Sequence, residues 1–164
     1  MVEFDLLQTI SQISAGFAGF TAIIVTFRPM KDWGEDEKLN LIHFLQLSIG
    51  VVLLALIPIA LSTHQTFSSS LWRFSNGAIG IYHLFLLGWI LARTTRISAF
   101  QELGNIVFAI LSCFGTSIAL VNLAVALGYF GSYEIIIYLF ALIWLLTMTL
   151  VNFVAILLQS IKQP

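Results

Sequence analysis

The chain has 164 residues, of which 59% are hydrophobic and 9% are charged, and its mean hydropathy is +0.99. Soluble domains carry about 25% charged residues, so a soluble fold could not hide this much apolar surface. The net charge of −1 gives no indication of nucleic-acid binding. The composition therefore predicts an integral membrane protein.

Five apolar runs are each long enough for a transmembrane helix, which needs about 20 residues. They cover approximately residues 6–27, 39–61, 71–92, 104–128 and 135–158. Runs of this length do not fit the short alternating strands of a membrane barrel, and almost no chain is left over for a soluble domain. The sequence therefore predicts an all-α bundle of about five transmembrane helices, forming a single transmembrane domain over residues 1–164.

The connectors between the runs carry helix-capping signals. Asp32 or Gly34 can cap the second helix, since both precede its acidic first turn. Ser98 and Gln101 have the spacing of a capping box ahead of the fourth helix. The glycine-containing segment 128–134 predicts a tight turn before the fifth helix.

Lysine and arginine fall unevenly on the two sides of the membrane that five spans define. One side holds only Arg73. The other side holds Arg28, Lys31, Lys38, Arg93, Arg96 and Lys162. The positive-inside rule then predicts an outside N-terminus and a cytoplasmic C-terminus. Glu3 and Asp5 are the reverse of the positive start of a signal peptide, so we expect the first span to be retained.

The first run is the most polar of the five. Gln8, Ser11 and Gln12 lie in its first half, and alanines and glycines follow. Gln8, Gln12, Ala15 and Gly19 are three or four residues apart, so they share one helix face. Such a helix does not suit lipid on every side, so we expect other helices to pack around it and this face to form a functional wall.

Neutral polar residues in several spans are candidates for the lining of a pore or cavity. Amides and hydroxyls can replace part of the hydration shell of an ion or solute without carrying charge. The alternative is that they form hydrogen bonds between packed helices, and for the histidines a proton relay is a third reading. The candidates are Gln8, Ser11, Gln12, Asn76, His83, Asn122, His43, Gln46 and Asn152.

Small residues and one proline mark candidate helix contacts. Ala15 and Gly19 are four residues apart, as are Gly115 and Ala119, and this spacing lets two helix backbones approach closely. Pro58 removes one backbone hydrogen bond from the second helix, so it is a candidate hinge or kink.

The sequence offers no pattern of catalytic or metal-binding residues. No acidic residue, lysine or arginine lies deep in a span, because Arg73 and Glu134 fall near span ends. Pumps, ion-coupled carriers and voltage sensors usually need such groups. The three histidines are widely separated, and no metalloprotease, serine-hydrolase or phosphate-loop motif occurs. We therefore expect no enzyme, no metal site and no cofactor.

Several short motifs in the first half of the chain resemble a group of small uncharacterised bacterial multi-pass membrane proteins. They are AGFAGF in the first span, Arg28 at its end, Trp33 in the acidic loop, Pro58 in the second span, and Trp72-Arg73 at the start of the third. The resemblance implies a bacterial inner-membrane location. It implies no known activity and assigns no functional residue.

Two functional hypotheses follow. The first is a homo-oligomeric channel or pore in which the first helix faces the pore and Gln8, Ser11 and Gln12 form an outer polar ring. The second is an accessory or scaffold subunit that binds a larger membrane or cytosolic protein and transports nothing itself. Both place the chain in a lipid bilayer, and neither involves nucleic acid.

Overall fold

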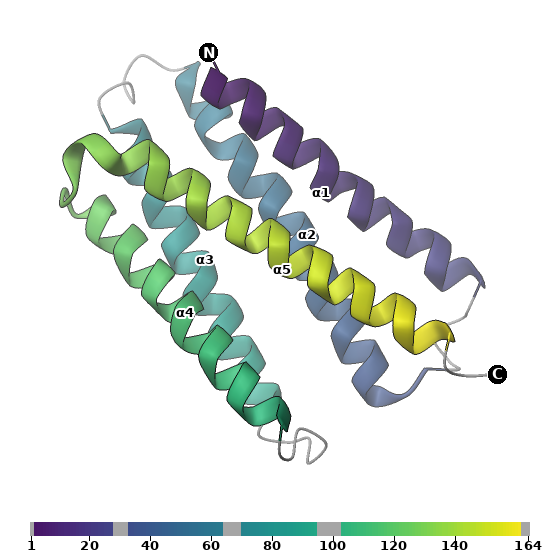
Figure 1. The fold of residues 1–164 in the computed structure, drawn as a ribbon. Helices are drawn as coiled ribbons and strands as arrows, with labels where there is room; N and C mark the ends of the chain where they lie inside the picture. Colours follow the sequence, from purple (N-terminus) through teal and green to yellow (C-terminus); the bar gives the residue numbers. More distant parts are fainter. Residues whose placement is uncertain (1, 28–32, 64–69, 95–102, 162–164) are drawn as a thin grey trace. The chain divides into compact units, whose positions relative to one another are not determined.

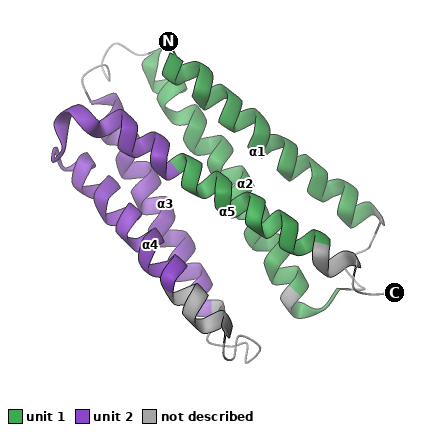
Figure 2. Cartoon of the chain, in the orientation of Figure 1, with its two compact units in different colours: residues 1–65, 142–164 green, residues 66–141 purple. Residues whose placement is uncertain are grey.

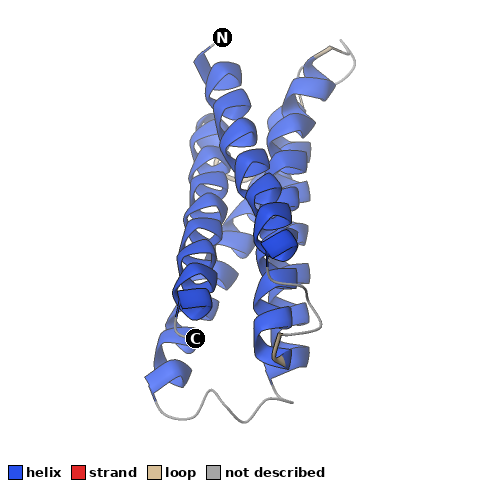
Figure 3. Ribbon diagram, turned by 90° about the vertical axis from the view of Figure 1, so that its right-hand side faces the viewer, coloured by secondary structure: helices blue, strands red, loops and turns tan. Residues whose placement is uncertain are grey.

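The computed structural model describes residues 2–27, 33–63, 70–94 and 103–161, which form five α-helices and, among these residues, no β-strand (Figures 1 and 3). The helices are α1 (Val2–Phe27), α2 (Glu35–Ser62), α3 (Leu71–Thr94), α4 (Leu103–Ala126) and α5 (Glu134–Ile161). A short 3₁₀ helix, η4 (Gly131–Tyr133), precedes α5. The predicted all-α fold is confirmed. Each predicted run corresponds to one helix, and the ends of the run and of the helix differ by a few residues at most.

Four of these helices are long and apolar enough to cross a membrane. The qualifying segments are Val2–Thr26, Glu37–Ser62, Leu71–Ala92 and Gly131–Leu157. The part of α4 with described side chains, Ile110–Ala126, is apolar but shorter, and α4 as a whole has 24 residues. The helices therefore suit a small membrane protein.

The chain divides into two compact units (Figure 2). The first unit comprises residues 1–65 and 142–164, and the second comprises residues 66–141. The first unit thus holds α1, α2 and the later part of α5. The second holds α3, α4 and the first turns of α5. The single transmembrane domain expected from the sequence stays a prediction.

In the first unit, α1 packs along α2. The Ser14 hydroxyl donates a hydrogen bond of 2.9 Å to the main-chain carbonyl of Ser48, and both residues are fully buried. The ring of Phe153 on α5 lies against Phe17 of α1 and Phe44 of α2. These contacts join all three helix segments into one core.

In the second unit, α3 and α4 approach each other closely at two glycines. A Cβ atom at Gly80 would lie 3.1 Å from the carbonyl oxygen of Ala119, and one at Gly77 would lie 3.3 Å from the Cβ of Ala126. Both distances are tighter than ordinary van der Waals contact, so a side chain at either glycine would require its neighbour on α4 to shift. The segment after α4 turns sharply, with positive φ angles of +95° at Gly128 and 67° at Phe130. The predicted turn before α5 is confirmed.

The start of α2 confirms one predicted cap. Gly34 is the N-cap residue, and its main-chain N–H donates a 2.9 Å hydrogen bond to the Glu37 carboxylate. Asp32 and the Ser98–Gln101 pair lie outside the described residues. Pro58 is buried inside α2, which continues to Ser62.

Candidate functional site

The polar residues of α1 lie on different faces of the helix. Gln8 and Gln12 are exposed, whereas Ser11 is buried against the rest of the chain. The helical period explains the division, because Gln8 and Gln12 are one turn apart and Ser11 lies about a quarter-turn away from Gln12. The sequence led us to expect neighbours around all of α1, and the single chain leaves the face with the two amides uncovered.

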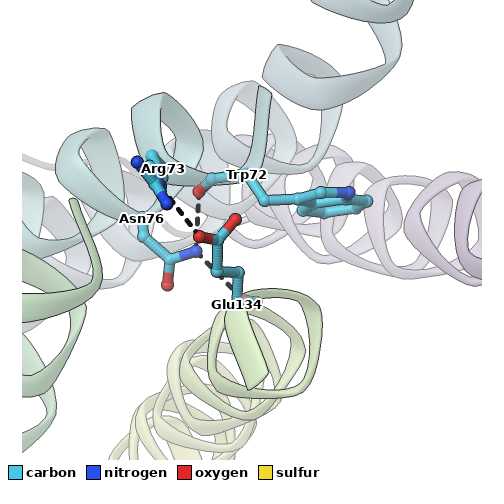
Figure 4. A network of polar contacts seen from close by, with 4 residues as sticks. All are labelled: Trp72, Arg73, Asn76 and Glu134. Carbon is cyan, nitrogen blue, oxygen red and sulfur yellow. Dashed lines mark hydrogen bonds and ion pairs between the residues drawn. The ribbon is translucent and has the colours of Figure 1, made fainter. Parts of the chain in front are cut away.

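A polar network fastens the start of α5 to α3 in the second unit (Figure 4). Arg73 Nε donates a 2.9 Å hydrogen bond to Glu134 Oε1. The Asn76 amide nitrogen donates to two main-chain carbonyls, that of Trp72 at 2.7 Å and that of Glu134 at 3.0 Å. The Trp72 ring meets the buried Tyr138 ring edge-to-face, with centroids 5.8 Å apart. Three residues of α3 and two of α5 thus order the turn that leads into α5.

This network was not predicted from the sequence. Both Arg73 and Glu134 fall near span ends in the sequence, but nothing in their 61-residue separation indicates that they pair. The Arg73 side chain is 48% exposed and that of Glu134 is 15% exposed. An ion pair this accessible contributes only about 0.2–1 kcal/mol to stability. Its main effect is therefore to position the start of α5 against α3.

Three other polar candidates bond to the backbone of their own helix. The amides of Asn122 and Asn152 donate to carbonyls four residues earlier, each at 2.8 Å. His83 Nδ1 lies 3.0 Å from the carbonyl of Ile79, also four residues earlier. Asn122 and His83 are buried, while Asn152 is half-buried. These bonds tie one polar atom of each side chain to its own helix and do not join helices.

Buried polar atoms remain without a hydrogen-bond partner in the second unit. They are Asn76 Oδ1, His83 Nε2 and Asn122 Oδ1. Asn76 still holds two carbonyls through its nitrogen, whereas the Asn122 amide reaches only its own helix. Asn122 is therefore the more dispensable of the two amides for stability.

The two remaining lining candidates, His43 and Gln46, are half-buried on α2 in the first unit. They belong to a different compact unit from Asn76, His83 and Asn122. The lining candidates are thus divided between the two units. Among the described residues, no group of three or more histidine, cysteine, aspartate or glutamate side chains could hold a metal ion.

The four predicted packing residues also differ in burial. Ala119 is fully buried, and its carbonyl faces Gly80 of α3, while Gly115 is half-buried. Ala15 and Gly19 are exposed on α1, and a Cβ atom added at Gly19 would meet no atom within 4 Å. Of the four, only Ala119 lies at a helix contact inside the chain, because a Cβ atom added at Gly115 would also meet no atom within 4 Å.

Comparisons of this chain with protein-family models, with curated proteins and with solved structures give no match.

Two asparagine substitutions separate a structural amide from a dispensable one. We expect Asn76→Leu to lower the free energy of unfolding by about 1 kcal/mol, because it removes the hydrogen bond to Glu134. Asn122→Leu removes only a hydrogen bond within its own helix, so its effect is expected to stay within about 0.5 kcal/mol of zero. Denaturant titration in detergent, followed by circular dichroism, measures both. Equal losses for the two variants would contradict this assignment.

Proposed function

We propose that the protein is a small homo-oligomeric membrane channel whose pore is lined by neutral polar side chains of α1. The observation that carries the proposal is the exposure of Gln8 and Gln12 on a helix long and apolar enough to cross a membrane. A polar group left against lipid without a hydrogen-bond partner costs several kcal/mol. Further copies of the chain, or water enclosed between them, would remove that cost.

The other polar candidates favour a pore between copies over a path through one chain. Asn76 and Asn122 are buried, and each donates its amide to a main-chain carbonyl. Asn152 and His83 are held by carbonyls of their own helices. Side chains bound in this way stabilise helices and offer little to a passing solute. We therefore place the lining on α1.

The proposed lining sets the class of permeant. In α1 the charged residues are Glu3 and Asp5, both in its first turn. Each glutamine amide has N–H donors and a carbonyl acceptor, so it can replace hydration around a charge of either sign. We propose passive movement of small ions or polar solutes. Coupling to protons or ions would need ionisable groups inside the spans.

We place this channel in a bacterial inner membrane with its N-terminus outside and its C-terminus in the cytoplasm. The uneven distribution of lysine and arginine supports the orientation, and the resemblance of the first half supports the location. Cysteines introduced near either end and labelled with a membrane-impermeant reagent test the orientation. Labelling of the C-terminal cysteine from outside would contradict it.

Replacing Gln12 with phenylalanine tests the pore. We expect Gln12→Phe to lower solute flux into liposomes by about tenfold or more, because a ring of phenylalanines at this depth excludes water. Ile13→Phe is the matched control, since Ile13 is exposed on the same helix, next to Gln12 in sequence, and is already large and apolar. Native mass spectrometry of both variants checks that the number of subunits is unchanged.

Unchanged flux through a correctly assembled Gln12→Phe oligomer would contradict the pore assignment. The accessory-subunit hypothesis predicts another result. The purified wild-type chain would then give no flux, and a larger membrane protein would be recovered with it from native membranes.

A further inference from the structure

One face of α1 lacks large apolar side chains along almost the whole helix. Its residues are alternately three and four positions apart, and we call them the α1 seam. They are Asp5, Gln8, Gln12, Ala15, Gly19, Ala22 and Thr26. Every one of them is exposed in the single chain. Each is polar or small, although the helix is apolar enough to span a membrane.

The other exposed helix surfaces have a different composition. On α5 the exposed large hydrophobic residues include Ile136, Phe140, Ile143, Leu150, Val151 and Val154. On α1 itself, Leu6, Ile13 and Phe20 form an exposed flank beside the seam, seven residues apart from one another. These are side chains that suit lipid. The α1 seam is thus a surface of another kind, next to one that lipid can cover.

The spacing of the seam indicates what covers it. Alternating steps of three and four average about 3.5 residues, less than the 3.6 of a straight helix. A face that keeps this period along a helix stays in contact with another helix only if the two supercoil with a left hand. A second, nearly parallel helix can therefore cover the polar and small residues of the seam along their whole length.

The polar groups on the seam indicate that this second helix is another α1. The Thr26 hydroxyl already donates to the Ala22 carbonyl at 2.7 Å. Asp5 lies in the first turn of α1, and Gln8 and Gln12 are the neutral amides that remain exposed on the seam. A primary amide is both donor and acceptor, so it is its own complement. Copies inserted with the same topology are related by an axis along the membrane normal, which brings equivalent residues together at equal depth.

The small residues of the seam permit the close approach that such a bundle needs. A Cβ atom at Gly19 would meet nothing within 4 Å, so the free space beside this residue lies outside the chain. Ala15 and Ala22, one turn to either side, are small as well. Helices with small residues at this spacing associate in lipid through backbone proximity.

We propose that copies of this chain assemble through α1 as a parallel, left-handed helical bundle, with the α1 seam facing the common axis. Gln8 and Gln12 of neighbouring copies hydrogen-bond to one another in the outer half, and Ala15, Gly19 and Ala22 bring the backbones together in the inner half. The inference rests on the homo-oligomeric part of the proposed function and does not require conduction.

Single cysteines on α1 test the geometry of this bundle directly. The native exposed Cys113 is first removed by Cys113→Ala. Seam positions are tested by Gln12→Cys, Ala15→Cys and Gly19→Cys, and flank positions by Leu6→Cys, Ile13→Cys and Phe20→Cys. Oxidative cross-linking is carried out in the native membrane, before detergent. We expect cross-linked dimers at the seam positions at several times the flank yield, recurring with the 3.5-residue period.

A bulky residue in the seam provides a second, independent test. Gly19→Leu is expected to abolish the oligomer seen by native mass spectrometry. The chain itself should stay folded, with an unchanged helical circular dichroism spectrum, because no atom of the chain would contact the new Cβ. An oligomer that survives Gly19→Leu would overturn the proposal.

The outcomes of cross-linking separate this inference from the pore. Cross-links confined to the seam would support the bundle even if the wild-type protein gave no flux, in which case only the channel would be lost. Yields at the flank equal to or above those at the seam would overturn the bundle. If flux were present at the same time, residues outside the α1 seam would line the pore.

Discussion

Gly80→Leu is expected to unfold the second unit, with a loss of about 3 kcal/mol or more in the free energy of unfolding. A Cβ atom at this position would lie 2.9 Å from Leu123 Cγ and 3.1 Å from the Ala119 carbonyl oxygen. The Leu123 side chain can rotate away, but the Ala119 carbonyl belongs to the backbone of α4 and can move only with that helix. The larger side chain therefore has to push α3 and α4 apart.

The separation is costly because α3 packs along α4, and pushing the two helices apart loses that packing. In a membrane, lipid tails are as apolar as the side chains, so helix association depends on close packing. Gly80 and Ala119 provide that packing, and even Gly80→Ala requires a backbone shift. The free energy of unfolding is measured by the same denaturant titration in detergent. The difference in Tm between wild type and variant is a second readout.

Gly88→Leu is the matched control for this experiment. Gly88 lies in the same helix two turns later, and a Cβ atom there would meet nothing within 4 Å. Both substitutions give the same gain in helix propensity, so the difference between them isolates the contact. If Gly88→Leu were as destabilising as Gly80→Leu, the close approach of α3 to α4 would not be the cause.

Helix positions were predictable from the sequence because one property determines them. A run of apolar residues long enough to span a bilayer has to be helical, since every backbone polar group needs a partner within the run. The Gly34 cap and the turn after α4 follow equally local rules. Each depends on residues within a few positions of one another, and such patterns are visible in one sequence.

Contacts between helices were not predictable in the same way. Gln8, Ser11 and Gln12 form one polar group in the sequence, yet the helix turns Ser11 toward the chain and leaves the two amides exposed. The division depends on which side of α1 faces α2, which requires knowledge of packing. The close helix contact at Gly80 was not predictable either, because it depends on Ala119, a residue in another helix.

The buried asparagines raise the same difficulty. Asn76 and Asn122 have the same side chain, and both lie in apolar runs. In the structure, Asn76 reaches the carbonyl of Glu134 on another helix, whereas Asn122 reaches only its own. Composition and periodicity treat the two residues alike. The difference between a helix-linking amide and a local one comes from distances that no single-sequence pattern encodes.

Phe153→Ala is expected to be the most damaging single truncation in the first unit, with a loss of about 2–4 kcal/mol in the free energy of unfolding. The Phe153 ring on α5 contacts rings from both other helices of this unit. Its centroid lies 5.4 Å from that of Phe17, 5.3 Å from that of Phe20 and 5.8 Å from that of Phe44. Each such pair contributes about 0.5–1.5 kcal/mol beyond the area it buries.

The comparison with Leu150→Ala separates packing from apolarity. Leu150 lies one turn earlier in α5 and is 46% exposed, so its truncation removes apolar surface from a site that lipid can refill. If apolar area alone stabilised this unit, the two truncations would cost similar amounts. If packing between rings stabilises it, Phe153→Ala removes ring contacts with α1 and α2 that lipid does not replace, and Leu150→Ala costs less than about 1 kcal/mol. A loss of under about 1 kcal/mol for Phe153→Ala would therefore mean that α5 is held to α1 and α2 by contacts other than these rings.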